Sequence, residues 1–123
     1  MIDLCARTQG ITWPGAETTG LLPHGLTLRS MDFYLDFIRG EHFNAIRLPI
    51  AHQSVLDDAP VSFSHFDPRL NPSLVDTDAV EQGAVEGQDG GLPYQDALLA
   101  FAREAAKRHL LVVVSAHRLK ASQ

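Results

Sequence analysis

The sequence contains one cysteine, Cys5, among 123 residues, so neither an internal disulfide nor a zinc–thiolate cluster can form. No apolar run approaches the roughly 18 residues that a membrane helix needs. The first residues lack the basic start and apolar centre of a secretion signal. Basic residues are few and scattered, ten against 15 acidic ones, and the formal net charge is −5. We therefore expect no membrane and no nucleic-acid partner.

The overall composition is that of an ordinary globular protein. Hydrophobic residues make up 45% of the chain and charged residues 20%, which argues against disorder, collagen-like repeats and a disulfide scaffold. A length of 123 residues gives room for one core. A complete eight-unit barrel, which needs roughly 250 residues, does not fit.

Periodicity predicts an alternation of strands and helices. A short β-prone segment covers about residues 8–13 and ends at Pro14-Gly15. An amphipathic helix follows from Ser30, its expected N-cap, to Gly40. We expect a second strand over 43–48, ended by Pro49, a second helix over 93–108 and a third strand over 110–114. The third strand is apolar without alternation, which indicates a strand covered on both faces in a parallel sheet.

A long segment, residues 50–92, separates the second strand from the second helix. It is rich in proline, glycine and acidic residues, and it predicts an irregular connection with at most a helical turn around 71–78. Such long loops in compact domains are usually functional or mobile.

Two polar side chains follow the predicted strands. Period-two alternation places Arg47 near the end of the second strand and His117 just after the third. Ligands of parallel α/β proteins bind at the carboxyl edge of the sheet, so a guanidinium and an imidazole side by side there would form a polar site. A salt-bridged arginine and a surface histidine explain the spacing equally well.

Four strings together resemble the opening of glycoside hydrolase family 5, the cellulase family, in its endoglucanase-like branch. They are GITWPGAETTG, LPHGLTLRS, FNAIRLPI and LLVVVSAHRL. Phe43–Pro49 matches the family's second-strand motif in full, and His117-Arg118 matches the end of its third strand. The resemblance runs from about Gly10 to Leu119 and covers the first three strands of an eight-stranded barrel.

The resemblance implies retaining hydrolysis of a β-linked glucan by two glutamates, about 5 to 5.5 Å apart, on the family's fourth and seventh strands. Both glutamates are missing from this chain, so no catalytic residue is assigned and the isolated chain is predicted to be inactive. Arg47 is implied to hold the nucleophile ionised, and His117 is implied to contact sugar hydroxyls at the cleavage point. Family members are often secreted.

Two further residues enter through the resemblance. Trp13 matches the family's first-strand tryptophan, for which core packing is the weightier interpretation, since most tryptophans are largely buried. His24 matches the His-Gly-Leu segment near the barrel mouth, where a hydrogen bond to loop backbone is at least as good an explanation as a substrate contact.

The chain also departs from the family pattern. Thr12 replaces an Asn and Ser115 an Asp, which changes the support of the site. His42 and His109 stand where the family usually has glycine between helix and strand. If the backbone there is left-handed, these histidines are mildly strained helix caps.

No cofactor or metal is predicted. None of the six histidines forms a close pair at helical ligand spacing or an HExxH pattern. The Asp57-Asp58 pair lies in a proline-rich loop, where a solvated surface is the better interpretation.

These observations predict an α/β fold, a partial TIM (β/α)8 barrel in strand-helix-strand-helix-strand order with a long second connection. Residues 1–123 would be the amino-terminal part of one incomplete domain. The function implied is hydrolysis of O-glycosyl bonds in a β-glucan such as cellulose. A non-catalytic carbohydrate-binding remnant and an inactive truncated gene product remain the alternatives.

The helices would cover one face of the sheet and leave the other face exposed. The exposed residues would be Phe43, Ala45, Leu111 and Val113, and we therefore expect marginal stability or self-association.

Overall fold

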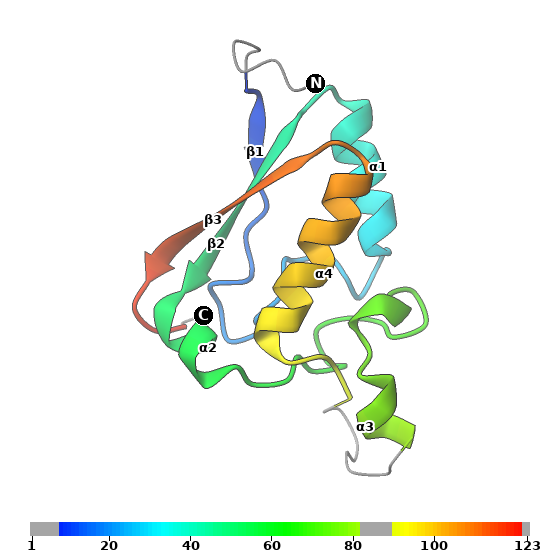
Figure 1. Ribbon diagram of the computed structural model, residues 1–123, viewed down its shortest axis with the longest axis vertical. Coiled ribbons are helices and arrows are strands. Elements are labelled where there is room, and N and C mark those ends of the chain that lie inside the picture. The colour runs from blue at the N-terminus through cyan, green and yellow to red at the C-terminus, as the bar shows by residue number, and fades with distance from the viewer. Residues whose placement is uncertain (1–7, 82–89, 122–123) are drawn as a thin grey trace.

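The fold is built on a three-stranded parallel sheet (Figure 1). The structure is a computed structural model that describes residues 8–81 and 90–121, so Cys5 lies outside the described residues. The strands are β1, Gly10–Thr12, β2, Ala45–Ala51, and β3, Leu111–Arg118. Their order is β1-β2-β3, with β2 pairing in parallel with both neighbours. The predicted α/β class and partial barrel are confirmed.

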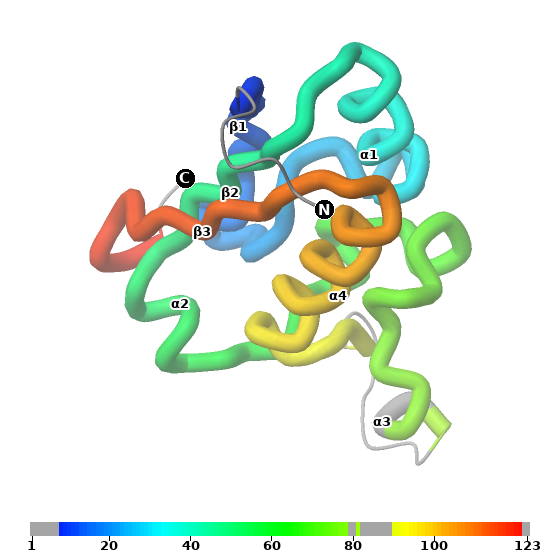
Figure 2. Tube along the Cα trace, turned by 45° about the horizontal axis from the view of Figure 1, so that its top comes forward, coloured from blue at the N-terminus to red at the C-terminus, as the bar shows by residue number. Residues whose placement is uncertain are grey.

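Two helices cover one face of this sheet, as Figures 1 and 2 show. They are α1, Met31–Gly40, and α4, Tyr94–Lys107. Ile46 and Leu48 of β2 share a buried cluster with Leu35 of α1 and Phe101 of α4, so these strand residues face the helices. Parallel strands require crossover connections, and right-handed crossovers bring successive helices to the same side.

The ends of the elements were predicted in part. Ser30 caps α1 as expected, because its Oγ accepts the Phe33 amide at 3.0 Å. Pro93 is the N-cap of α4, one position before the first helical residue. β1 is shorter than predicted, and β3 extends to Arg118 rather than ending at Val114.

The prediction that Pro49 ends the second strand is wrong. β2 continues through Pro49, opposite Ser115, to Ala51. The carbonyl of Arg47 accepts the Trp13 amide at 3.0 Å, so the backbone groups of residue 47, and by alternation of residue 49, point towards β1. Because β1 ends at Thr12, opposite Arg47, no strand faces Pro49 on that side. The missing N–H therefore removes no ladder hydrogen bond.

The segment 50–92 contains more regular structure than predicted. The expected turn around 71–78 is present as a 3-10 helix, Pro72–Leu74, and the start of α3, Thr77–Glu81. The helix α2, His52–Asp57, was not predicted. It has six residues and no side-chain N-cap, too few for a helical period to show in the sequence.

The face of the sheet opposite α1 and α4 is only partly open. Leu111 and Val113 are 60% and 46% exposed, as predicted. Ala45 is buried, since a small side chain on the central strand is shielded by both neighbours, and Phe43 is half-buried against the main core.

Both main helices end in a left-handed histidine. His42 has φ +69° and His109 has φ +58°. After α1 the His42 amide donates to the Arg39 carbonyl and the Phe43 amide to the Ile38 carbonyl, and the same pattern follows α4 at His109. These are Schellman motifs, whose left-handed position favours glycine. The capping interpretation of the two histidines is confirmed.

We expect His42→Gly and His109→Gly each to raise the free energy of unfolding by about 0.5–1 kcal/mol. The left-handed conformation costs a residue with a Cβ roughly 1–2 kcal/mol, and the extra freedom of glycine in the unfolded chain offsets part of the gain. Urea unfolding followed by circular dichroism measures the change. Ala106→Gly, inside the last turn of α4, is the control and should lower stability by a similar amount. If both histidine variants lost stability, the left-handed backbone would not be strained at His42 and His109.

Arg108, the C-cap of α4, joins the two helices. Its guanidinium donates to Asp36 at 2.6 Å and Asp32 at 3.0 Å on α1, and to the Glu104 carbonyl at 2.9 Å. The Asp36 carboxylate raises the pKa of Arg108 above its usual value, which reflects the close pairing of the two side chains. Hydrogen bonds from Lys107 and Arg108 lower the pKa of Glu104.

Replacing Arg108 with Gln should lower the free energy of unfolding by about 1–2 kcal/mol at pH 7, since several partly exposed ion pairs are lost together. Arg108 is the smaller cause of the lowered Glu104 pKa, after Lys107, which the variant keeps. The stability that comes from the Arg108–Glu104 pair is present above the ordinary carboxyl pKa and is lost as the pH falls through the folded value. The gap between wild type and variant should therefore narrow from pH 6 to pH 3 in urea titrations.

Arg103→Gln provides the matched control. Arg103 is exposed on the same helix and has no ion-pair partner within residues 8–81 and 90–121. An equal loss of stability in both variants would show that Arg108 does not join the helices through its charge.

Candidate functional site

The first predicted site residue, Arg47, lies on the uncovered face of the sheet. It is the third residue of β2 and alternates with Ile46 and Leu48, which face the helices. Its side chain is exposed and has no hydrogen-bond or ion-pair partner in the part of the chain that the structure describes. The salt-bridged arginine considered from the sequence is therefore absent from those residues.

His117 lies further along the sheet than expected. The register pairs Arg47 with Val113, so His117 is four residues closer to the carboxyl edge, roughly 13 Å along the strand. It is the extra residue of a bulge opposite Ala51 and is exposed. We expected Arg47 and His117 to lie side by side at the ends of their strands. This expectation is wrong, because β2 continues past Pro49 to Ala51 and Arg47 lies in its middle.

Two of the residues that depart from the family pattern, Thr12 and Ser115, lie near Arg47 on the neighbouring strands. Thr12 pairs with Arg47 across the ladder and is exposed. Ser115 pairs with Pro49, and its Oγ is buried without a hydrogen-bond partner among the described residues. A buried hydroxyl without a partner is costly, and proline offers no donor opposite it. The uncovered face thus contains an arginine and a hydroxyl, neither of them satisfied by the described residues.

Trp13 lies inside the core. Its ring contacts those of Tyr34 and Phe101, with centroids 5.2 and 5.6 Å away, and it is 9% exposed. The indole Nε1 donates to the carbonyl of His24 at 2.9 Å. The His24 amide in turn donates to Pro14, while the imidazole is exposed. Trp13 and the backbone of His24 therefore hold the loop that follows β1.

A buried carboxylate in this loop was not predicted. Glu17 is 8% exposed, and its Oε2 accepts the amide of Gly15 at 2.9 Å. The hydroxyl of Tyr94, the first residue of α4, donates to the neighbouring Ala16 carbonyl at 2.9 Å. Burial, with a smaller effect of the Glu17 charge, raises the pKa of Tyr94 to about 12. The sequence held one signal for this site. Glu17 follows apolar and glycine residues directly after the first strand, and the sequence analysis did not use it.

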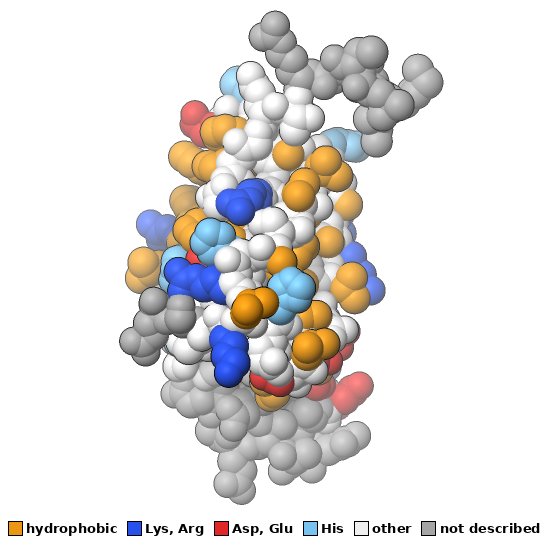
Figure 3. All heavy atoms as spheres, turned by 90° about the vertical axis from the view of Figure 1, so that its left-hand side faces the viewer, with side chains coloured by type: hydrophobic (Ala, Val, Ile, Leu, Met, Phe, Trp, Pro, Cys, Tyr) orange, Lys and Arg blue, Asp and Glu red, His pale blue; other side chains and the backbone are white. Residues whose placement is uncertain are grey.

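Figure 3 shows the side of the molecule turned away from α1 and α4. Hydrophobic side chains are interspersed there with basic and histidine side chains, and acidic ones gather mainly towards the lower end. The exposed side chains on the uncovered face of the sheet include Leu111, Val113 and Arg47. The basic side chains of this surface can donate hydrogen bonds to a ligand or partner that carries oxygen acceptors.

The described residues contain neither a metal-binding cluster nor a membrane-spanning helix. No three His, Cys, Asp or Glu side chains there come together as a metal site would require. Over the same ranges, no helix has the length and apolar character needed to span a membrane.

Comparison with known proteins points to one class of enzyme. No family model matches the sequence. An endoglucanase of Paenibacillus polymyxa is 38% identical over 76 residues, which is 62% of this chain. The solved structure of a cellulase in a cellulase–inhibitor complex covers 96% of this chain with a TM-score of 0.73 and 26% identity. A variant of the Pyrococcus horikoshii endocellulase in complex with cellotetraose covers 93%, with a TM-score of 0.71 and 27% identity.

The chain is cellulase-like. The predicted resemblance to cellulases is thereby confirmed, and the three strands and their helices correspond to part of a cellulase fold. The cellulase-like chain spans 19% of the length of the Paenibacillus endoglucanase and 27% and 26% of the two solved chains.

Proposed function

We propose that this chain belongs to a glycoside hydrolase that acts on a β-linked glucan such as cellulose. The observation that carries the proposal is the 38% identity to an endoglucanase, together with the Phe43–Pro49 motif on the central strand of a cellulase-like sheet. The solved relative in complex with cellotetraose supports a β-glucan as the ligand class.

The mechanism proposed is retaining hydrolysis by two glutamates, one acid/base and one nucleophile. Neither is assigned to this chain, because the resemblance places them on the family's fourth and seventh strands. Arg47 would hold the nucleophile ionised through a charge-assisted hydrogen bond. The guanidinium lies exposed on the uncovered face and no residue within 8–81 and 90–121 pairs with it, which supports a role in binding a carboxylate. His117 would contact sugar hydroxyls nearer the carboxyl edge.

Trp13 and His24 take supporting roles in this proposal. The indole fixes the His24 carbonyl, which leaves the exposed imidazole at the surface of the loop after β1. Trp13 would act through this loop rather than by touching the sugar.

The 123-residue chain should show no turnover of an aryl β-cellobioside above buffer, because neither proposed glutamate belongs to it. Release of the aryl group, followed by absorbance, measures the rate. Robust hydrolysis that disappears when an acid of this chain, such as Glu17 or Asp57, is replaced by Ala would overturn the assignment of the glutamates.

A second candidate is a carbohydrate-binding module without catalysis. It is favoured by the side chains of Arg47 and His117, which are exposed and make no hydrogen bond or ion pair with the residues that the structure describes. Cellotetraose should then bind saturably, whereas α-linked maltotetraose should not. Arg47→Ala should weaken cellotetraose at least tenfold in calorimetric titrations, since it removes a charged donor. Arg103→Ala, on the far side of α4, should bind as wild type does. Equal binding of both sugars, or an unchanged affinity in Arg47→Ala, would contradict this candidate.

A further inference from the structure

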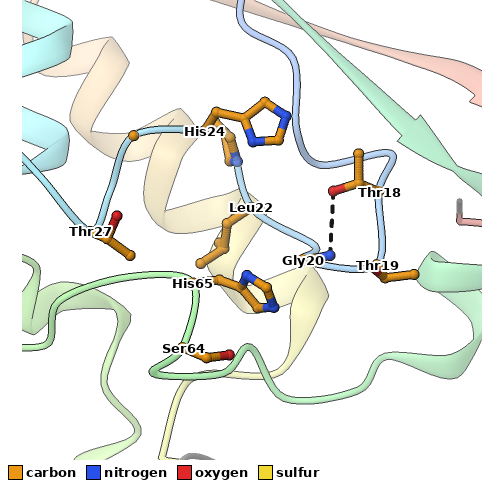
Figure 4. A pocket seen from close by; sticks show the side chains of 10 residues that line it. Thr18, Thr19, Gly20, Leu22, His24, Thr27, Ser64 and His65 are labelled. Carbon is orange, nitrogen blue, oxygen red and sulfur yellow. Dashed lines mark hydrogen bonds between the residues drawn. The ribbon is translucent and has the colours of Figure 1, made fainter. Parts of the chain in front are cut away.

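The exposed aromatic side chains of this protein lie on one helix. The chain has six Phe, two Tyr and one Trp, and of these only Phe33 and Phe37 are exposed, by 49% and 58%. Both belong to α1. In contrast, the cavity of about 460 Å³ between the loops that follow β1 and β2, which Thr27 and His65 help to line, contains no Phe, Tyr or Trp (Figure 4). An aromatic platform is therefore available on α1 and not in this cavity.

Phe33 and Phe37 lie on the side of α1 that faces away from the sheet. The buried residues of the helix are Met31, Leu35 and Ile38, which pack towards the sheet. The helical period places Phe33 and Phe37 on the other side, one turn apart, with Cβ atoms about 6 Å from each other. Two rings thus follow one another along the outer surface of the helix.

A cation and an anion stand at the two ends of this pair of rings. Arg29, four residues before Phe33, holds its guanidinium carbon 5.3 Å from the centre of the Phe33 ring. Glu41, four residues after Phe37, is the exposed C-cap of α1. We call these four residues the α1 row.

The Phe33 ring is held in place before any ligand arrives. Its centroid lies 5.6 Å from that of Tyr34, with the two planes at 82°. The Tyr34 hydroxyl in turn donates to the Gly25 carbonyl at 2.7 Å, which fixes the Tyr34 ring. A ring that is already ordered loses less conformational entropy when a ligand packs on it.

The rest of the α1 row keeps binding capacity. Among the described residues, the Phe37 ring has no aromatic or cationic neighbour, and the Glu41 carboxylate has no hydrogen-bond or ion-pair partner. The neighbouring flank of the helix differs, since Asp32 and Asp36 both pair with Arg108 of α4. The row is thus separate from the contacts that join the two helices.

The chemistry of the row suits a β-linked glucan better than a protein partner. The hydroxyls of β-linked glucose are equatorial, so the faces of each sugar ring carry C–H groups that pack on aromatic rings, while the hydroxyls can bond to charged side chains. Two half-exposed phenylalanines offer roughly 200 Å² of apolar surface. A stable protein interface needs roughly 800 Å² from each partner. The row is therefore too small for a second copy of the chain and large enough for a short glucan.

We propose that the α1 row is a second binding site for the β-linked glucan, on the helix side of the sheet and away from Arg47. One sugar ring lies on the Phe37 ring and the next lies against Phe33. Their hydroxyls bind the Arg29 guanidinium and the Glu41 carboxylate. The inference rests on the proposed function, which supplies the ligand class. Because the contact is limited to two rings, the dissociation constant for cellotetraose should lie in the millimolar range.

Titration of the ¹⁵N-labelled 123-residue chain with cellotetraose tests the α1 row, because each amide reports on its own surroundings. The amides of Phe33 and Phe37 should shift saturably. Phe37→Ala should weaken this binding about tenfold, because it removes the ring on which a sugar lies. Phe37→Leu keeps an apolar side chain without a flat ring face and should also weaken binding, whereas Phe37→Trp should bind at least as tightly as wild type.

Leu99→Ala is the matched control. Leu99 is 51% exposed on α4 and lies outside the α1 row, so its removal should leave the α1 titration within about twofold of wild type. An equal loss of binding in Leu99→Ala and Phe37→Ala would show that the sugar does not recognise the row.

Three results would overturn the α1 site. The first is a wild-type chain whose α1 amides do not shift saturably. The second is an unchanged α1 titration in both Phe33→Ala and Phe37→Ala, with native circular dichroism. The third is a dimer in sedimentation that Phe37→Ala dissociates, with no sugar-induced shift on α1, because the row would then join two protein chains.

The proposed function is decided separately. Arg47→Ala should leave the α1 titration unchanged, since Arg47 lies on the opposite face of the sheet, and a loss of α1 binding in this variant would contradict a separate site. Failure of the α1 site leaves the hydrolase proposal to the aryl β-cellobioside assay, and binding on the uncovered face to the effect of Arg47→Ala there.

Discussion

The central strand β2 organises this molecule, because every other part is placed by what β2 pairs with or packs against. Its backbone is paired on both sides, with β1 over three positions and with β3 along its full length. Parallel pairing cannot be made with tight turns, so α1 and α4 must cross one face to return the chain to the same end of the sheet. Ile46 and Leu48 are buried under those helices, and Arg47 between them is directed to the open side.

That division of β2 into two faces decides where chemistry can occur. The helix-covered face is a closed core that Trp13 enters from the end of β1. The open face carries the Arg47 guanidinium and the buried Ser115 hydroxyl, neither of which has a side-chain partner among the described residues, and it exposes a leucine and a valine. Polar groups without partners and apolar side chains exposed to water both favour an occupant on this face. The cavity between the loops lies at the edge of the same sheet.

Much of this arrangement could be predicted from residues. The α1 helix, with Ser30 as its cap, follows from periodicity, and the left-handed histidines follow from their position between helix and strand. The end of β2 could not be predicted, because the effect of Pro49 depends on where the neighbouring strand stops. The helix α2 and the buried Glu17 were missed, since six residues show no period and burial of an acid depends on what packs over it.

The sequence by itself determined the order of the three strands and the two main helices, the parallel sheet and the cellulase resemblance, because these depend on local periodicity and on short motifs. Only the tertiary structure decided the register that separates Arg47 from His117 and the cavity that Thr27 and His65 line from two loops far apart in the sequence. Register and loop contact arise from pairing and packing between residues far apart along the chain, and no local pattern encodes those distances.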